Sequence, residues 1–165
     1  MDAFTEKRIK MSNLEECIIK AHEDGLVDHI AVRVGKGEQI LNDCFYSVDY
    51  AIDSKTLFDM ASVTKIMVTT MLTLIAADRK LLNFDDKVNR FFPCPNDKSE
   101  LTIKHLLTHT MGYGHRSLCE KGNTYDNIQN YILSLPCDFP VGTKVDYSCP
   151  GFILLGKILE KVFGD

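Results

Sequence analysis

The sequence predicts a fold of mixed helix and sheet, an α+β arrangement within the broad α/β class, in which a helix and an antiparallel hairpin precede a mostly helical block. Three observations predict it: an apolar helical stripe bounded by capping signals, two alternating segments joined by glycines, and a series of helical patterns in the remainder of the chain. With 165 residues, the chain has the size of one domain and can bury a substantial core.

An amphipathic helix is expected near the start of the chain. Ser12 and Glu15 have the spacing of a capping box, and apolar residues then recur on one helical face until Gly25. Glycine is the usual residue just past the end of a helix, so both ends are marked. The apolar face consists of Leu14, Cys17, Ile18 and Ala21.

Two extended segments are expected after this helix. Ile30, Val32 and Val34 alternate with less apolar neighbours, and a second segment runs from residue 40 to residue 46. The Gly-Lys-Gly sequence at 35–37 suits a tight turn between them. The pattern predicts an antiparallel hairpin, which is marginally stable unless strands or a helix pack against it.

A helix buried on all sides is expected from Ser62 to about Arg79. Apolar residues occupy nearly every face of this segment. Its longest apolar run, residues 66–77, is too short to cross a bilayer and begins beside Lys65. The segment therefore predicts a core helix, and no membrane span is expected.

Shorter helices are expected in the remainder of the chain. Thr102 is placed as an N-cap, and Thr124 precedes a stripe of apolar residues at helical spacing. Pro150 is placed as the first residue of a last helix, which stops at Gly164.

A single domain, residues 1–165, is the expected organisation, because the sequence shows no internal repeat, low-complexity stretch or clear linker. Within it, residues 12–60 hold the first helix and the sheet strands. Residues 61–165 form the helical block.

Charge and composition argue against several kinds of partner. The chain has 19 basic and 23 acidic residues, a net charge of -4, with no long run of either sign, so nucleic acid is not expected as a partner. The first residues lack the apolar stretch of a secretory signal, which predicts a cytoplasmic location. The six cysteines form no C-x-x-C pair, so we expect reduced thiols and no metal site.

The candidate chemistry centres on Ser62 and Lys65. The G-x-S-x-G elbow, the phosphate-binding loop and the H-E-x-x-H motif are absent. Ser62 opens the expected buried helix, where the helix dipole and free backbone N–H groups can stabilise negative charge. Lys65 lies one turn later, and burial lowers the pKa of a lysine, so a neutral Lys65 could accept the serine proton. The alternative is that Ser62 is only an N-cap and Lys65 a solvated helix residue.

Four segments, in this order, resemble blocks of the serine β-lactamase and penicillin-binding protein family, of the class C β-lactamase type. They are residues 57–65, 101–112, 140–148 and 154–160. The resemblance covers the chain from residue 26 onward. It implies a β-lactamase/transpeptidase-like fold whose C-terminal sheet strands are absent from this chain.

The resemblance also implies roles for three residues. Ser62 looks like the acylated nucleophile and Lys65 like its base or proton shuttle. Tyr147 matches the tyrosine of the family's Tyr-x-Asn block, which exchanges protons with the nucleophile and the leaving group. Without the resemblance, Tyr147 would be interpreted as a core residue. No cofactor is implied.

Cys149 departs from the family's pattern, which has asparagine at this substrate-binding position. An asparagine amide offers two donors and an acceptor, whereas a thiol is a weak donor and a weak acceptor. We therefore favour an esterase-like or peptidase-like hydrolase over a true β-lactamase. A buried inert cysteine and a reactive thiol at the start of the following helix are alternative interpretations.

His105 and His109 lie one helical turn apart, which is the spacing of some metal-binding pairs, but no third ligand is evident. In the resembling family this block is a structural connection. His109 to Gly112 is accordingly interpreted as the end of a helix, with Gly112 as its cap.

The predicted function is that of a serine acyl hydrolase acting through a Ser62 acyl-enzyme on a small-molecule ester, amide or D-amino-acid peptide. The family completes its site with a Lys/His-x-Gly segment that would lie beyond residue 165. We therefore expect this chain to be a truncated and inactive fragment of such an enzyme. The alternative is a non-catalytic interaction module or a degenerate relative, so enzyme activity and oligomeric state are left open.

Overall fold

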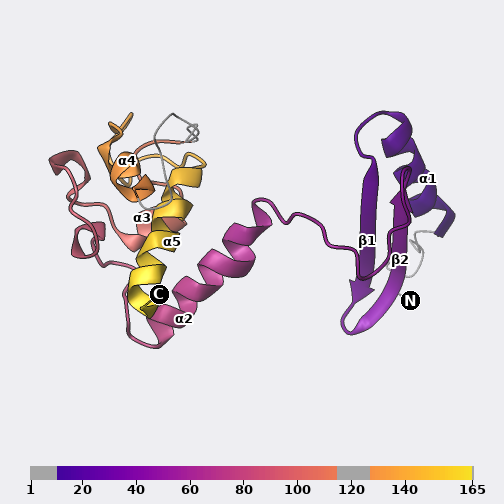
Figure 1. Cartoon of the computed structure of the whole chain (residues 1–165), viewed down its shortest axis with the longest axis horizontal. Coiled ribbons are helices and arrows are strands. Elements are labelled where there is room, and N and C mark those ends of the chain that lie inside the picture. The colour runs from indigo at the N-terminus through magenta and orange to yellow at the C-terminus, as the bar shows by residue number, and fades with distance from the viewer. Residues whose placement is uncertain (1–10, 115–126, 165) are drawn as a thin grey trace, which may run out of the picture. The chain divides into compact units, whose positions relative to one another are not determined.

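The computed structural model describes residues 11–114 and 127–164, with side chains from residue 14 onward. The chain divides into two compact units, Met1–Asp59 and Met60–Asp165. The first holds α1 (Met11–Glu23), β1 (His29–Lys36) and β2 (Gln39–Ser47) (Figure 1). The second holds the π-helical segment η1 (Lys65–Thr70), α2 (Met71–Asp78), the 3₁₀ turns η2 (Val88–Arg90) and η3 (Asn96–Lys98), α3 (Ile103–Leu107), α4 (Ile128–Ser134) and α5 (Cys149–Phe163).

In the first unit, the predicted helix and antiparallel hairpin are confirmed. The helix ends before Gly25, whose φ of 71° is the left-handed conformation that glycine adopts without strain. The two strands pair with Ile30 opposite Tyr46, and the register shifts between Val34 and Gly35. Helix α1 contacts β2, which gives the hairpin the support that it lacks alone. The Ser12 side chain, and with it the predicted capping box, lies outside the described residues.

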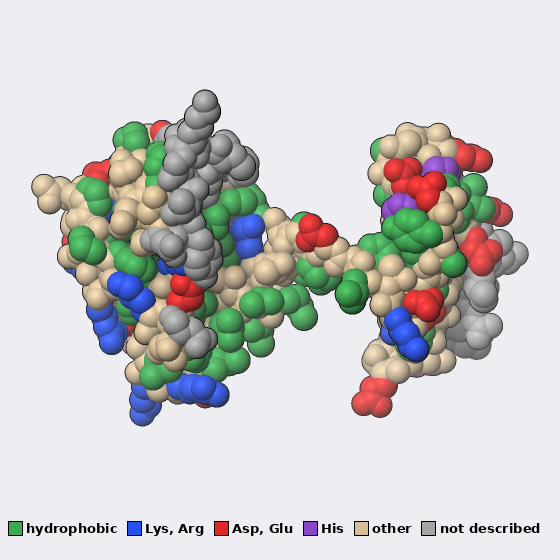
Figure 2. Space-filling view, in the orientation of Figure 1, with side chains coloured by type: hydrophobic (Ala, Val, Ile, Leu, Met, Phe, Trp, Pro, Cys, Tyr) green, Lys and Arg blue, Asp and Glu red, His purple; other side chains and the backbone are tan. Residues whose placement is uncertain are grey.

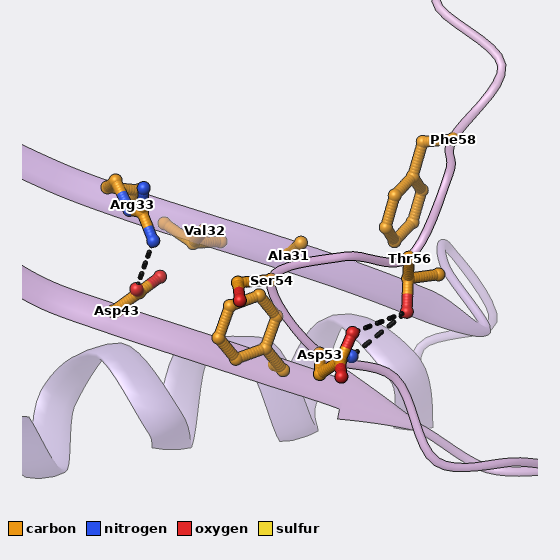
Figure 3. A pocket seen from close by; sticks show the side chains of 9 residues that line it. Ala31, Val32, Arg33, Asp43, Asp53, Ser54, Thr56 and Phe58 are labelled. Atoms are coloured by element: carbon orange, nitrogen blue, oxygen red, sulfur yellow. Dashed lines mark hydrogen bonds and ion pairs between the residues drawn. The ribbon is translucent and has the colours of Figure 1, made fainter.

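A shallow pocket of about 200 Å³ lies on this unit, between the hairpin and residues 53–58 (Figure 3). An ion pair between Arg33 and Asp43 forms one part of its wall. At another part, the Asp53 amide donates to the Thr56 hydroxyl at 3.0 Å. All of its lining residues belong to the first unit, so the pocket includes none of the predicted catalytic residues.

In the second unit, α5 has more buried residues than any other described helix. It passes between α2 on one side and α3 and α4 on the other (Figure 1), and it contacts all three. The Tyr113 side chain is fully buried here, and its hydroxyl donates to the Ile132 carbonyl at 2.6 Å. The other residues with no exposed surface include Leu101, Ile103, Leu106, Met111, Leu154, Leu155 and Ile158.

The prediction of a helix buried on all sides after Ser62 is wrong. Within 65–78, only Thr73 and Ala76 are buried, whereas Ile66 is 65% exposed and Met67 is 62% exposed. The physical reason is that, among the described elements, α5 packs against one side of this helix and leaves the other sides uncovered. Figure 2 shows apolar side chains at the surface of the second unit.

The ends of the later helices follow local signals. The Thr102 hydroxyl accepts a hydrogen bond from the His105 amide, so Thr102 caps α3 as predicted. Pro150 lies in the first turn of α5, and Gly164 ends that helix in the left-handed conformation with a φ of 86°. Thr124, the predicted cap of α4, lies outside the described residues.

Candidate functional site

Three predicted site residues meet around one oxygen atom. The Tyr147 hydroxyl donates to Ser62 Oγ at 2.7 Å, and Lys65 Nζ donates to the same oxygen at 3.2 Å. Lys65 Nζ also lies 5.2 Å from the centroid of the Tyr147 ring. Ser62 is exposed, Lys65 is half-buried and Tyr147 is 45% exposed, so the cluster is open to a ligand from solvent.

Ser62 lies in a tight turn directly before the helix. The preceding residue, Ala61, has a φ of 42°, which is unusual for a residue other than glycine. Backbone hydrogen bonds from Val63 to Met60 and from Lys65 to Ser62 close this turn. The amides of residues 63–65 are therefore engaged with carbonyl oxygens and are not free to bind an oxyanion.

Lys65 is presented by a π-helical turn. The segment η1 begins at Lys65, and the Thr70 hydroxyl donates to the Lys65 carbonyl at 2.8 Å. Single π-turns within helices occur frequently at functional sites. Because Lys65 follows Ser62 by three residues, its ammonium reaches back over the serine.

Tyr147 is held by a loop that runs alongside the end of α3. The Gly142 amide donates to the Thr110 carbonyl, and the Asp146 amide donates to the His109 carbonyl, both at 2.8 Å. The next residue, Ser148, is fully buried, and its hydroxyl caps α5 by accepting from the Gly151 amide at 3.2 Å. Tyr147 therefore projects from a backbone that is fixed on both sides.

The ionisation of Lys65 differs from the sequence prediction. Burial, the largest contribution, lowers its pKa, but the hydrogen bonds and charges of Tyr147 and Cys149 together outweigh burial. The net pKa of Lys65 lies above its ordinary value of 10.5. The expectation that burial leaves Lys65 neutral is therefore wrong, because the lysine is only partly desolvated and has two acidic neighbours.

Cys149 lies beside this cluster as the first residue of α5. This half-buried free thiol lies near enough to Lys65 to help raise the pKa of that lysine, so it belongs to the surroundings of the site rather than to the core. The position at which the sequence departs from the family's asparagine is therefore next to the lysine.

The two predicted histidines have separate partners. His105 Nδ1 accepts from the Thr102 amide at 3.2 Å and belongs to the capping box of α3. His109 instead contacts the site, since its ring lies 4.7 Å from the Tyr147 ring and 5.0 Å from the Phe152 ring. Within residues 11–114 and 127–164, no group of three His, Cys, Asp or Glu side chains has the geometry of a metal site.

Two residues at the site were not predicted as functional from the sequence. The sequence places His109 at a predicted helix end and does not single out Phe152, whose ring centroid lies 6.0 Å from Lys65 Nζ. The signal for His109 was its position within a block that resembles the family. No comparable signal marked Phe152.

No helix in the described part of the chain is both long and apolar enough to traverse a membrane.

Comparisons with known proteins agree with the geometry of the site. The sequence model of the Beta-lactamase family matches residues 19–165. N-acetylmuramyl-L-alanine amidase of Bacillus subtilis (strain 168) is 30% identical over 127 residues, which cover 67% of this chain and 29% of the relative. Esterase EstB of Burkholderia gladioli is 36% identical over 132 residues, which cover 66% of this chain and 33% of the relative.

One solved structure supports the same assignment of the fold. The octameric penicillin-binding protein homologue from Pyrococcus abyssi matches with a TM-score of 0.82 and 20% identity, over 94% of this chain and 40% of that chain. At this identity the match shows the fold alone. The chain spans about a third of the length of the curated relatives that it matches.

Proposed function

Because the chain belongs to the beta-lactamase family, as its match over residues 19–165 shows, we propose that the protein is a serine acyl hydrolase in which Ser62 forms an acyl-enzyme. The family and the fold class predicted from the sequence are confirmed. The observation that carries the proposal is the convergence of Tyr147 and Lys65 on Ser62 Oγ. Two relatives are named an amidase and an esterase, which supports transfer of an acyl group from an amide or an ester.

The number of protons that Ser62, Lys65 and Tyr147 share determines which group can act as the base. In the resting arrangement both Tyr147 and Lys65 donate to Ser62 Oγ, so neither can accept the serine proton. The cluster must therefore lose one proton before reaction. Because its neighbours raise the pKa of Lys65, we assign the ammonium form to Lys65 and the role of proton acceptor to the Tyr147 oxygen.

The reaction then proceeds in two balanced halves. Ser62 Oγ attacks the acyl carbon while its proton passes to the Tyr147 oxygen, and the same proton leaves with the departing alcohol or amine as the acyl-enzyme forms. Water then attacks the acyl carbon and gives a proton to Tyr147, which returns it to Ser62 Oγ when the acid is released. Lys65 stays positively charged throughout and stabilises the negative charge on the Tyr147 oxygen.

Cys149 is the residue from which we infer the substrate class. The thiol lies beside Lys65 where the family has an amide, and it is too weak a hydrogen-bond partner to hold the amide side chain of a β-lactam. We therefore propose esters, or peptides that do not depend on that contact, as the substrate class. Because the chain spans about a third of its curated relatives, these properties are proposed for the whole protein.

Covalent labelling tests the proposal directly. The full chain is treated with an alkyl fluorophosphonate, and the expected adduct is a bond between Ser62 Oγ and phosphorus with loss of fluoride, located by peptide mass spectrometry. The Ser62→Ala variant should give no adduct. Ser99→Ala removes another exposed serine of the same unit and should label like the unmodified chain.

The same experiment distinguishes the competing function. Circular dichroism first establishes that each sample is folded. A folded chain that forms no adduct at Ser62 would show that the proposed chemistry is absent, and a non-catalytic interaction module would then be the better description. An adduct of equal yield in Ser62→Ala would show that the label reports a different residue.

A further inference from the structure

His109 adopts a left-handed backbone conformation that is uncommon in residues other than glycine. Helix α3 ends at Leu107, and His109 follows with a φ of 56°, in the left-handed region usually occupied by glycine or asparagine. In non-glycine residues such strain persists only where the surrounding structure holds it, and it is frequent at functional sites.

The conformation directs three groups of His109 to the residues around Tyr147. The His109 carbonyl accepts from the Asp146 amide at 2.8 Å, and its Nδ1 accepts from the Ser148 amide at 3.0 Å. Its ring lies against the Tyr147 ring, with centroids 4.7 Å apart and planes inclined by 36°. His109 thus accepts hydrogen bonds from the amides of the residues before and after Tyr147, and its ring packs against the Tyr147 ring.

We propose that His109 is the positioning residue for Tyr147: its neutral imidazole accepts the Ser148 amide and packs on the phenol ring, which keeps the hydroxyl at Ser62 Oγ. The inference rests on the proposed function, because it assigns His109 a role in the same proton transfer. Since the Ser148 amide is a donor, Nδ1 must be unprotonated and the ring proton must lie on Nε2.

The electrostatic surroundings of His109 agree with this tautomer. Burial lowers the pKa of His109, and the charge of Lys65 lowers it further. The ring is therefore neutral at neutral pH. A protonated ring would point a second N–H at the Ser148 amide and lose the hydrogen bond.

Three substitutions of His109 distinguish the effects of its hydrogen bond, its ring contact and its backbone conformation. His109→Asn tolerates the left-handed backbone and keeps a side-chain oxygen that can accept from the Ser148 amide. His109→Phe keeps a ring against Tyr147 but has no acceptor. His109→Gly relieves the backbone strain and removes both contacts. His105→Asn is the matched control, because His105 lies one turn earlier and contacts Thr102 rather than Tyr147.

Two readouts are compared for each variant of the full chain. The first is Ser62 labelling by the fluorophosphonate, resolved into its saturation constant and its maximal rate. We expect the maximal rate to fall roughly 10- to 100-fold in His109→Gly, with an unchanged saturation constant, and to recover partly in His109→Asn. The second is NMR of the Tyr147 ring and of Ser148 amide exchange, with Tyr147→Phe assigning the ring signals.

The NMR readout does not depend on labelling. In His109→Gly the Tyr147 ring signals should shift and the Ser148 amide should exchange about tenfold faster, while His105→Asn leaves both unchanged. If the unmodified chain does not label but these NMR changes occur, the proposed function fails and the positioning by His109 stands. Equal maximal labelling rates in the unmodified chain and His109→Gly, or unchanged Tyr147 signals in His109→Gly, would overturn the positioning role.

Discussion

The Tyr147 hydroxyl lies 2.7 Å from Ser62 Oγ, although 85 residues separate them in the sequence. Ser62 belongs to the turn before η1, and Tyr147 to the loop before α5, and these two helical segments contact each other. The hydrogen bond therefore depends on tertiary packing. Any substitution that removes the phenol hydroxyl without disturbing this packing isolates its chemical contribution.

Replacing Tyr147 with phenylalanine should slow acylation of Ser62 without unfolding the chain. The substitution removes the donor to Ser62 Oγ but keeps the ring that packs on His109. A positioned acid or base contributes about 100- to 10,000-fold to a rate, so we expect fluorophosphonate labelling to fall within that range. The rate of adduct formation, measured by intact-protein mass spectrometry, checks this.

The control for this substitution is Tyr50→Phe, which alters a 57%-exposed tyrosine of the first unit. Its labelling rate should equal that of the unmodified chain. If Tyr147→Phe labels within twofold of the control, the phenol does not take part in proton transfer, and Lys65 would have to supply the base.

Replacing Cys149 with asparagine should shift the substrate preference toward β-lactams. The new amide supplies two donors and an acceptor beside Lys65, where the thiol supplies weak ones. We expect the ratio of nitrocefin to p-nitrophenyl ester turnover to rise about tenfold, the effect of one or two well-placed hydrogen bonds. Parallel spectrophotometric assays of both substrates give the ratio.

Cys137→Asn is not a suitable control, because that thiol packs closely against Gly112. Cys44→Ser in the first unit changes a free cysteine without changing the site and should leave the ratio as it was. A nitrocefin preference already present in the unmodified chain would contradict the role that we assign to Cys149.

Features determined by neighbouring residues were predictable from the sequence. The end of α1 shortly before Gly25, the hairpin and the Thr102 cap each depend on residue types within a few positions, and each is found in the structure. The family was predictable because four short blocks occur in a fixed order. Those blocks also indicated Ser62 and Tyr147, which the structure brings together.

Features determined by distant neighbours were not predictable in the same way. The apolar pattern after Ser62 indicated burial, but a pattern does not specify what covers each face, and α5 covers one side only among the described elements. Burial was expected to leave Lys65 neutral, but Tyr147 and Cys149, which are remote in sequence, outweigh burial and raise its pKa. The strained φ of His109 likewise follows from contacts with the Tyr147 loop.

Stability should decrease as the pH falls below about 6.5. The pKa values of His105 and His109 both lie below their ordinary value of 6.5, mainly because burial disfavours the charged rings. The unfolded chain binds protons first, so acid favours unfolding: the stabilisation is complete above pH 6.5 and is lost as the pH falls through the lower folded values. Urea titrations at pH 7.5, 6.0 and 5.0 measure it.

A double variant, His105→Asn with His109→Asn, should show a smaller decrease between pH 7.5 and pH 5.0 than the unmodified chain. Asp97 acts in a separate window, since the hydrogen bond from Lys98 holds its pKa below 3.8 and that stabilisation is lost only at lower pH. An equal slope in the double variant would mean that the two histidines do not cause the acid sensitivity.

Truncating Ile158 should destabilise the second unit without altering the chemistry of Ser62. Ile158 lies on the buried side of α5 and has no exposed surface. Ile158→Ala should therefore lower the free energy of unfolding by about 2–5 kcal/mol. Ile153→Ala is the matched control on the same helix, and since Ile153 is 39% exposed it should cost about 1 kcal/mol or less. Urea denaturation of the three proteins gives both values.

The labelling rate separates this effect from that of Tyr147→Phe. Under conditions where Ile158→Ala remains folded, α5 still carries Ser148 and Cys149 at its first turn, so the rate of Ser62 labelling should match the unmodified chain. Tyr147→Phe should show the opposite result, with near-normal stability and slow labelling. Equal losses of stability in Ile158→Ala and Ile153→Ala would contradict the packing of α5 described for the second unit.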